Sequence, residues 1–342
     1  MTPIGILGIG ALTPFGNDLE AIWAAVREDR KPAAGFLAGP RGQRPLPVFR
    51  VAPACEVRHP RLRRASPISH FAAAASLAAT AEPEGAFSAK RTALIFAATD
   101  GAVIYSRRFF EEVLASGSGS PLLFPETVYN AAASHVAAML GIDGCVLTLV
   151  GDATAGMSAL ATSLDVLEAG EADRCLVVAS QEVDWISAEG YRRWGVVDGR
   201  ARGGAQLAEG ACALLLGPAG PEDVTVQRVH PGVAAMPELR HESLRQICAD
   251  FARGEPPDLA VHSAAKPSPD AEEEIVAAGF PRALRLAPKS VLGEAFAAST
   301  LLQVACGCLA IRKGLGRCAA ITVSGWSGQS GGAVLTASAA GE

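Results

Sequence analysis

The segment from Cys145 to Glu182 constrains the fold of this chain more than any other segment. Its sequence is CVLTLVGDATAGMSALATSLDVLEAGEADRCLVVASQE. An apolar run stops at Gly151-Asp152, and apolar residues then recur at helical spacing. The pattern predicts a strand, a tight turn, a helix and a second strand, which together make one βαβ unit. The backbone N–H groups of residues 153–155 then lie at a helix N-terminus, where they favour a nucleophile or a developing negative charge.

Composition bounds the class of protein. The chain has 342 residues, of which 49% are hydrophobic, so it can bury a large core as two ordinary domains or one large α/β unit. It carries 30 basic and 35 acidic residues and has no basic stripe with interleaved aromatics, which argues against a nucleic-acid partner. Strands punctuated by glycine alternate with helices of about 10–18 residues, which predicts an α/β fold with mixed sheets.

Nothing in the sequence predicts a membrane segment or a metal site. The first residues enter a strand pattern without a basic segment or cleavage site, and no apolar run approaches the ~18 residues of a spanning helix. The chain is therefore expected to be cytoplasmic, without membrane insertion. The 8 cysteines lie mostly in apolar patterns and lack C-x-x-C or His-paired zinc spacing, which predicts buried reduced thiols. We expect no metal and no cofactor.

Other elements follow from local patterns. Residues 3–11 read as a strand, 18–27 as a helix and 91–99 as a strand, and Pro, Gly and Arg in 31–65 indicate an excursion over the surface. Gly8-Ile9-Gly10 lacks the third glycine and the acidic residue of a dinucleotide-binding fingerprint. The cluster Arg61-Leu62-Arg63-Arg64 is either a solvated patch or a surface that attracts an acidic carrier protein.

Five motifs, in order along the chain, resemble those of the β-ketoacyl synthases of the thiolase superfamily. In the segment 145–182, Gly156, Ala159 and Gly170-Glu171-Ala172-Asp173 match the family's nucleophile elbow without a gap. This register puts Ala153 where the family has its nucleophilic cysteine. The resemblance implies a thiolase-like α-β-α-β-α fold with two pseudo-repeated halves, 1–217 and 218–342, in one compact unit.

The later motifs place the rest of the family's active site. His262 matches a catalytic histidine in a motif that also keeps Pro267 and Asp270, and Glu273 falls where the family commonly has an acidic residue. Lys289 matches a family lysine. Glu294 stands in place of the second catalytic histidine.

Two further matches concern a loop and an interface. Gly325, Trp326 and Gly328 lie where the family has a glycine-rich gating loop. A helix predicted from Pro125 to Leu140 carries Asn130 and His135, which match a family helix that packs at the dimer interface. A lone histidine on such a helix is otherwise expected to be a structural residue.

The altered site restricts the chemistry. Condensation requires a thiolate that is acylated at the helix N-terminus, and losing a covalent nucleophile costs about 10⁴–10⁶ in turnover. A carboxylate at Glu294 would repel the enolate that the family's histidines stabilise, and a nearby Lys289 would keep it ionised. The set His262, Lys289 and Glu294 is then a salt-bridged remnant, an acid–base site repurposed with Asp152, or part of an acyl pocket without chemistry. Asp152 alone is most simply a turn or N-cap residue.

The resemblance therefore suggests a ketosynthase-like subunit that is not acylated, similar to chain length factors. Such a subunit would pair with an active β-ketoacyl synthase and an acyl carrier protein in polyketide, aryl-polyene or unusual fatty-acid biosynthesis. One alternative is an enzyme that acts on acyl thioesters through His262 with Asp152 or Glu294, as a hydrolase, decarboxylase or acyltransferase. Another is a homodimeric scaffold without a substrate.

Overall fold

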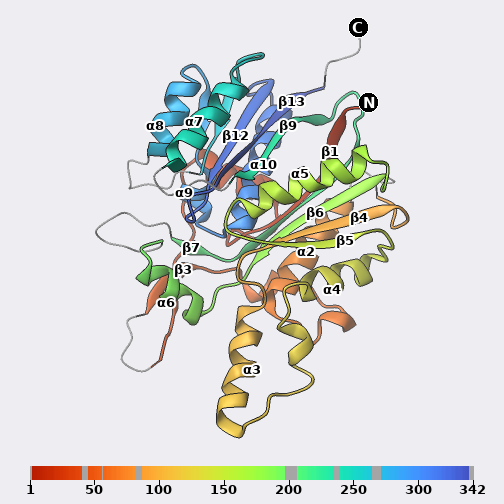
Figure 1. Cartoon of the computed structure of the whole chain (residues 1–342), viewed down its shortest axis with the longest axis vertical. Helices are drawn as coiled ribbons and strands as arrows, with labels where there is room; N and C mark the ends of the chain where they lie inside the picture. Colours follow the sequence, from red (N-terminus) through yellow and green to blue (C-terminus); the bar gives the residue numbers. More distant parts are fainter. Residues whose placement is uncertain are drawn as a thin grey trace.

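The computed structural model describes residues 2–40, 45–55, 57–81, 87–196, 206–233, 239–263 and 271–338. Ten strands in these ranges form one hydrogen-bonded sheet (Figure 1). In order across the sheet, the first five are β5 (Val146–Val150), β4 (Thr92–Ala98), β6 (Arg174–Gln181), β8 (Gly210–Pro218) and β1 (Ile4–Leu12). The next five are β9 (Val224–Val233), β13 (Ser330–Ala337), β12 (Cys318–Ser324), β10 (Leu259–Val261) and β11 (Leu284–Leu286).

The two sets of five strands have the same topology. Counted along the chain within each set, the order outward from the junction is first, fifth, fourth, second, third. In each set the fifth strand is antiparallel to both neighbours, and the other outer strands are parallel. The sets join where Gly5 and Ile6 of β1 pair with Thr225 and Val224 of β9. The predicted pseudo-repeat of mixed strands is confirmed, with the two sets joined into one sheet. The boundary at residues 217 and 218 stays a prediction.

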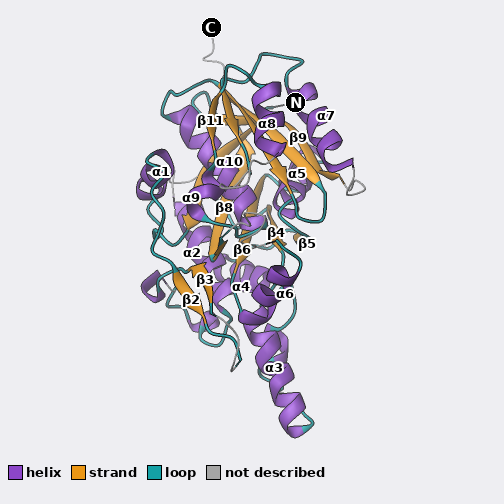
Figure 2. Ribbon diagram, turned by 90° about the vertical axis from the view of Figure 1, so that its left-hand side faces the viewer, coloured by secondary structure: helices purple, strands orange, loops and turns teal. Residues whose placement is uncertain are grey.

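Helices form three layers around the two sets of strands. Helices α5 (Ala155–Glu168) and α10 (Ala297–Arg312) lie between the sets, because the largest core cluster contains residues of both helices and of both sets. Helices α2 (Pro67–Ala81) and α4 (Ala131–Leu140) cover the outer face of the first set. Helices α7 (Arg240–Phe251) and α8 (Ala271–Gly279) cover the outer face of the second. Figure 2 shows helices on both sides of the strands. The α-β-α-β-α architecture is the predicted one.

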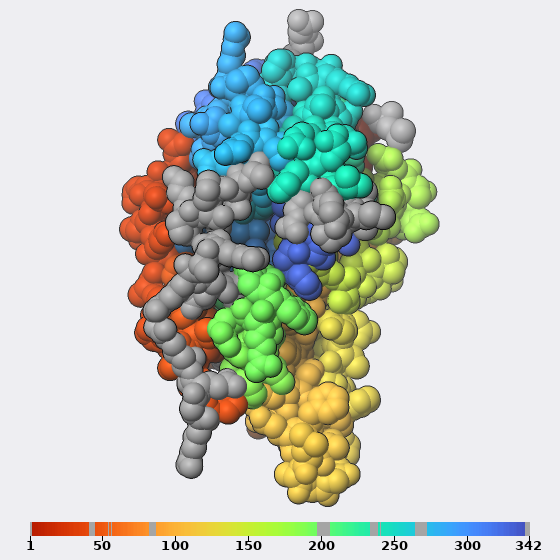
Figure 3. Space-filling view, turned by 60° about the vertical axis from the view of Figure 1, so that its left-hand side comes forward, coloured from red at the N-terminus to blue at the C-terminus, as the bar shows by residue number. Residues whose placement is uncertain are grey.

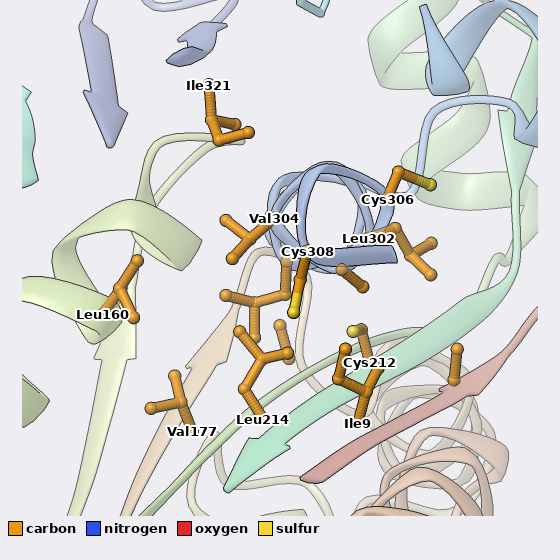
Figure 4. Close-up of a cluster of buried hydrophobic side chains, with 14 of the residues drawn as sticks. Ile9, Leu160, Val177, Cys212, Leu214, Leu302, Val304, Cys306, Cys308 and Ile321 are labelled. Atoms are coloured by element: carbon orange, nitrogen blue, oxygen red, sulfur yellow. The ribbon is translucent and has the colours of Figure 1, made fainter. Parts of the chain in front are cut away.

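The central helix α10 is buried on every side. All residues from Ala297 to Ile311 are buried, as expected for a helix that is apolar around its whole circumference. Figure 4 shows Cys308 of α10 pointing toward Leu214 and Cys212 of β8. Burial raises the pKa of the Cys306 thiol to about 12 and that of Cys308 to about 11. These thiols are unreactive core residues.

The other cysteines mostly follow the same pattern. Six of the eight are buried, Cys55 is half-buried and Cys145 is exposed.

A glycine of the first strand has a packing role. A Cβ at Gly10 would stand 1.9 Å from the carbonyl oxygen of Ala75 in α2. The glycine therefore allows β1 to approach the alanine-rich helix α2. This packing explains why a glycine stands at position 10 without invoking a dinucleotide-binding loop.

The remaining elements lie around the layers. They are α1 (Leu19–Arg27), α3 (Val103–Ser116), α6 (Trp185–Arg193), α9 (Pro288–Leu292) and a small sheet of β2 (Gly35–Leu37), β3 (Leu46–Phe49) and β7 (Leu207–Ala208). The segment 31–65 thus contributes two strands of this small sheet. Sequence patterns predicted no element at α3, which projects from the body in Figure 1. Within the described ranges, no helix is long and apolar enough to cross a bilayer.

One predicted helix begins later than expected. The helix predicted from Pro125 begins instead at Ala131, and residues Phe124–Glu126 form a separate 3-10 turn. The hydroxyl of Thr127 donates to the Phe124 carbonyl oxygen at 2.7 Å, and the Thr127 N–H bonds to the same atom at 3.0 Å. This local bonding closes the turn before an α-helix can propagate.

Candidate functional site

The turn between β5 and α5 places Ala153 at the tip of a central helix. Ala153 is 2% exposed, and its carbonyl oxygen accepts a hydrogen bond from Thr300 Oγ1 of α10 at 2.5 Å. A Cβ at Gly156 would stand 2.5 Å from the Ala297 carbonyl oxygen. The first turns of α5 and α10 are therefore in contact, and their positive dipole ends lie close together. At this point the chain presents the methyl group of Ala153.

Asp152 holds two turns together. Its Oδ1 accepts hydrogen bonds from the N–H and the hydroxyl of Thr154 at 2.9 and 2.8 Å. Its Oδ2 accepts from the Ser327 N–H at 3.1 Å and from the Ser327 hydroxyl. A Cβ at Gly325 would stand 1.9 Å from Oδ2, so a side chain at this position would collide with the carboxylate. Both oxygens are engaged, which favours a turn role for Asp152 over an acid–base role.

An aromatic stack connects the predicted gating loop to the interior. The ring of Trp326 lies parallel to that of Trp194, with centroids 5.8 Å apart, and meets Tyr191 edge-on at 6.1 Å. Tyr191 in turn packs against the buried ring of Phe296 at 4.6 Å. Gly328 has a φ of +90°, so the turn requires glycine there. In Figure 3, α6 (green) borders a dark blue segment of the C-terminal part.

The remaining family positions lie after β10 and in the segment that leads into the other central helix, α10. Lys289 Nζ lies 2.7 Å from Glu294 Oε2, and the two side chains are 4% and 10% exposed. Glu294 Oε1 accepts a hydrogen bond from the Phe296 N–H at 2.8 Å. His262 is buried directly after β10, and its backbone N–H bonds to the Leu286 carbonyl oxygen at 3.0 Å. The structure thus brings Lys289 and Glu294 together as a buried ion pair in the second half, after its third strand, just as Ala153 follows the third strand of the first.

The motif around His262 is only partly visible. Pro267 and Asp270 lie outside the described residues. The buried acidic residue of the next helix is Glu272, whereas Glu273 is half-buried. Glu272 Oε1 accepts from the Ser263 N–H at 2.9 Å, and Oε2 accepts from the Ser263 hydroxyl at 2.6 Å. This contact fixes the backbone beside His262.

His135 and Asn130, the residues predicted at a dimer interface, differ in their surroundings. His135 Nε2 lies 2.9 Å from Glu126 Oε1, which ties α4 to the preceding 3-10 turn. Asn130 occupies the position before α4, is exposed and makes no capping bond with its side chain. The geometry gives His135 a structural role, and an interface role for either residue stays a prediction.

Sequence reasoning missed a group of buried polar residues where β4 and β6 end. Glu182 is fully buried and accepts hydrogen bonds from Ser66 Oγ at 2.6 Å, Ile68 N at 2.9 Å and Ile104 N at 2.8 Å. Burial outweighs these bonds and raises the pKa of the Glu182 carboxyl to about 7. The signal was present, because polar residues at the carboxyl ends of parallel strands often form sites.

Exposed apolar side chains gather on α3, on the segment after it and on β5. None of the residues of α3 is buried, and Leu114 is 87% exposed. Strand β5 ends the ten-stranded sheet with an open edge. We call these residues the partner face: Phe110, Leu114, Leu122, Phe124, Val146, Leu147 and Val150. An open apolar edge strand of this kind is a template for association.

In the ranges that the structure describes, no group of three or more His, Cys, Asp or Glu side chains could hold a metal ion.

The layered fold and the elbow at Ala153 define a thiolase-like protein. The sequence matches the family model for the β-ketoacyl synthase N-terminal domain over residues 48–219. The chain belongs to the β-ketoacyl synthase family. A comparison with curated protein sequences finds no match.

Solved structures show the same fold. The ishigamide ketosynthase/chain length factor has a TM-score of 0.84 at 21% identity, covering 98% of this chain and 100% of that one. AntDE:AntF, a type II polyketide synthase acyl-carrier protein in complex with its ketosynthase, has a TM-score of 0.82 at 15% identity and covers 98% and 100%. The ketosynthase ApeO in complex with its chain length factor ApeC, from Xenorhabdus doucetiae, has a TM-score of 0.81 at 14% identity and covers 98% of each chain.

The buried ion pair yields a stability prediction. Replacing Lys289→Met leaves Glu294 buried without its counter-charge, which should lower the free energy of unfolding by about 3–5 kcal/mol. Adding Glu294→Gln should restore part of that loss, because the amide can still accept from the Phe296 N–H. Urea unfolding measures both variants.

A matched ion pair at the surface serves as the control. Lys313 Nζ also lies 2.7 Å from a glutamate oxygen, that of Glu20, but the two side chains are 33% and 68% exposed. Lys313→Met should cost at most about 1 kcal/mol. Equal losses for Lys289→Met and Lys313→Met would contradict the buried-pair account.

The raised pKa of Glu182 predicts a pH dependence of stability. The folded state binds this proton more tightly than a carboxyl with the ordinary pKa of 4.5 does in the unfolded chain. The free energy of unfolding should therefore fall as the pH rises from about 4.5 to about 7. Glu182→Gln should remove this part of the slope in urea titrations from pH 4.5 to 8. The exposed Glu28→Gln variant should keep it, and an unchanged slope in Glu182→Gln would refute the assignment.

Proposed function

We propose that this chain is a non-acylating ketosynthase-like subunit of the chain-length-factor type. It pairs with an active β-ketoacyl-ACP synthase in polyketide, aryl-polyene or unusual fatty-acid biosynthesis. The observation that carries the proposal is the methyl group of Ala153 at the tip of α5. The helix N-terminus that would lower a thiol pKa and stabilise an oxyanion is present, but the atom that would attack a thioester is missing.

The ion pair at the start of α10 supports the same proposal. Decarboxylation of a malonyl group develops negative charge on an enolate oxygen, which needs donors or positive charge nearby. Here the carboxylate of Glu294 is held against Lys289 at 2.7 Å, so the lysine charge is already neutralised. The pair keeps the second helix start in place and gives little help to an enolate.

The partner face supports pairing with another subunit of the same fold. Strand β5 leaves its N–H and C=O groups open along one edge, and its own residues Val146, Leu147 and Val150 are exposed. The same edge strand of a second chain can pair with β5, so that one sheet continues from this subunit into its partner. Two of the similar structures contain a ketosynthase together with a chain length factor. A ketosynthase is therefore the partner that we propose, with a homodimer as the alternative.

A basic cavity supports a carrier protein as the second partner. Arg58, His59, Arg63 and His70 are among the residues that line a cavity of about 520 Å³. Arg61 and Arg64, on either side of Arg63, are exposed. None of the residues lining this cavity is acidic, so its charge complements an anionic carrier protein.

The enzymatic alternative finds less support in the geometry. It requires His262 to act with Asp152 or Glu294 on an acyl thioester. Asp152 bonds to Thr154 and Ser327, and Glu294 bonds to Lys289 and the Phe296 N–H. Neither carboxylate is a free base. The other alternative is a homodimeric scaffold without a substrate. The acylation and association experiments below distinguish it from the proposed subunit.

The missing thiol predicts the outcome of acylation. When the native chain and a co-expressed ketosynthase are incubated with octanoyl-acyl carrier protein, intact-mass analysis should find octanoyl on the ketosynthase and none on this chain. Ala153→Cys should gain one octanoyl group, because a thiol would then stand at the helix N-terminus.

A matched variant tests the position. Ala159→Cys places a thiol in the same helix at a fully buried residue, and it should remain unmodified. Acylation of the native chain on any cysteine would overturn the proposal. If the Ala153→Cys protein folds correctly but is not acylated, the missing thiol is not the only reason that the native turn accepts no acyl group.

The partner face predicts the effect of a charge on assembly. Val146→Lys puts an ammonium on the open edge of β5 and should abolish association with a ketosynthase in size-exclusion chromatography with light scattering. Leu284→Lys is the matched control, because Leu284 is equally exposed on β11, the edge strand at the opposite end of the sheet. Loss of assembly in both variants, or in Leu284→Lys alone, would place the interface elsewhere.

A further inference from the structure

Two polar side chains with a buried oxygen atom, those of Thr99 and Gln181, stand where β4 and β6 end. In the parallel ladder Ala97 pairs with Ala179, so Thr99 and Gln181, two residues further along each strand, lie at the same level. On its other side β4 pairs with β5, where Ala97 lies opposite Leu149. Gly151, two residues after Leu149, is therefore at the level of Thr99. Thr99 therefore lies between Gln181 and the turn that carries Ala153.

Gln181, the last residue of β6, lies on the face of the sheet that looks at the central helices. Side chains alternate along a strand, and Ala179, two residues before Gln181, shares a core cluster with Met157 of α5. Thr99 follows directly after β4 and is half-buried, with its Oγ1 buried. Gln181 is 1% exposed.

The amide of Gln181 has a defined orientation. Its Nε2 donates to Asp100 Oδ2 at 2.8 Å and to the Glu182 carbonyl oxygen at 2.9 Å. Both are acceptors, so the nitrogen must point toward them and Oε1 must point away. Asp100 is held in its turn by the hydroxyl of Tyr191, which donates to Oδ1.

Two atoms of this group have unused hydrogen-bonding capacity. Among the described residues, neither Gln181 Oε1 nor Thr99 Oγ1 has a hydrogen-bond partner, although both atoms are buried. Leaving such an atom unsatisfied costs about 1–3 kcal/mol. Gln181 Oε1 can only accept, whereas the threonine hydroxyl can donate or accept. A hydroxyl group can satisfy both.

We infer that Thr99 and Gln181 form a polar subsite that receives a hydroxyl or enol group of a bound acyl chain, beside the turn at Ala153. The inference rests on the proposed function and specifies its substrate class: oxygenated acyl chains are preferred over saturated ones. Tyr191 and Asp100 are positioning residues, because they orient the Gln181 amide without reaching the chain.

Binding of pantetheine thioesters tests the inference. The complex with the partner ketosynthase is titrated with decanoyl-pantetheine and with hydroxydecanoyl-pantetheines that carry the hydroxyl at carbon 3, 5, 7 or 9. The ketosynthase carries a cysteine-to-alanine change in its own elbow, so that no chain is transferred. Isothermal titration calorimetry should show at least one hydroxylated chain binding about 10-fold more tightly than decanoyl, as expected for one added hydrogen bond to a buried group.

Two variants assign the effect to the subsite. Thr99→Val keeps the shape and removes the hydroxyl, so it should abolish the preference, and the hydroxylated chains should then bind no more tightly than decanoyl to the same variant. Ser76→Ala removes another buried hydroxyl without a partner, in α2 of the outer layer, and should leave the preference intact.

The remaining outcomes separate the inference from the proposed function. If decanoyl and every hydroxylated chain bind equally, or if the preference survives Thr99→Val, the subsite is refuted and the proposed function stands. If no thioester binds, decanoyl included, although the complex assembles, acyl binding by this chain is refuted and the subsite with it.

Discussion

The contact between the first turns of α5 and α10 is the constraint on which the rest of the structure depends. Thr300 of α10 bonds to the carbonyl oxygen of Ala153, and Gly156 admits the backbone of Ala297. The two helices start in contact and form one layer. The apolar surfaces on both sides of this layer are covered by the two sets of strands. The strand order is the same in the two sets, and the apolar surface of α10 is buried in full.

The same contact concentrates two helix N-termini at the position where the family performs its chemistry. Such a place favours negative charge, and this chain supplies it from within the protein. Asp152 accepts a hydrogen bond from the Thr154 N–H in the turn before α5, and Glu294 lies just before α10 against Lys289. The charges that would assist a bound thioester in an active ketosynthase are thus balanced internally. What remains is a layered body whose elbow carries the methyl group of Ala153.

The proposed function depends on the surfaces around the elbow. The partner face offers an open strand and a projecting helix without buried residues, while the aromatic stack from Phe296 to Trp194 runs from the interior to the surface beside the predicted gating loop. The polar pair Thr99 and Gln181 lies in the interior beside the elbow. Under the proposed function, a subunit built in this way influences which chain is held without reacting with it.

The sequence alone determined the class of fold, because the segment 145–182 has both strand and helix periodicity and carries the family's spacing in register. It also determined that position 153 lacks sulfur, since this depends only on residue identity. The tertiary structure decided which side chains meet. The ion pair of Lys289 with Glu294 and the tie from Asp152 to Ser327 join residues whose separation in space no local pattern encodes. Helix α3 was missed although its apolar residues recur at helical spacing, and only the tertiary structure shows that none of its residues is buried. Gln181 and Thr99 became neighbours only through the register of β4 with β6, which long-range pairing sets.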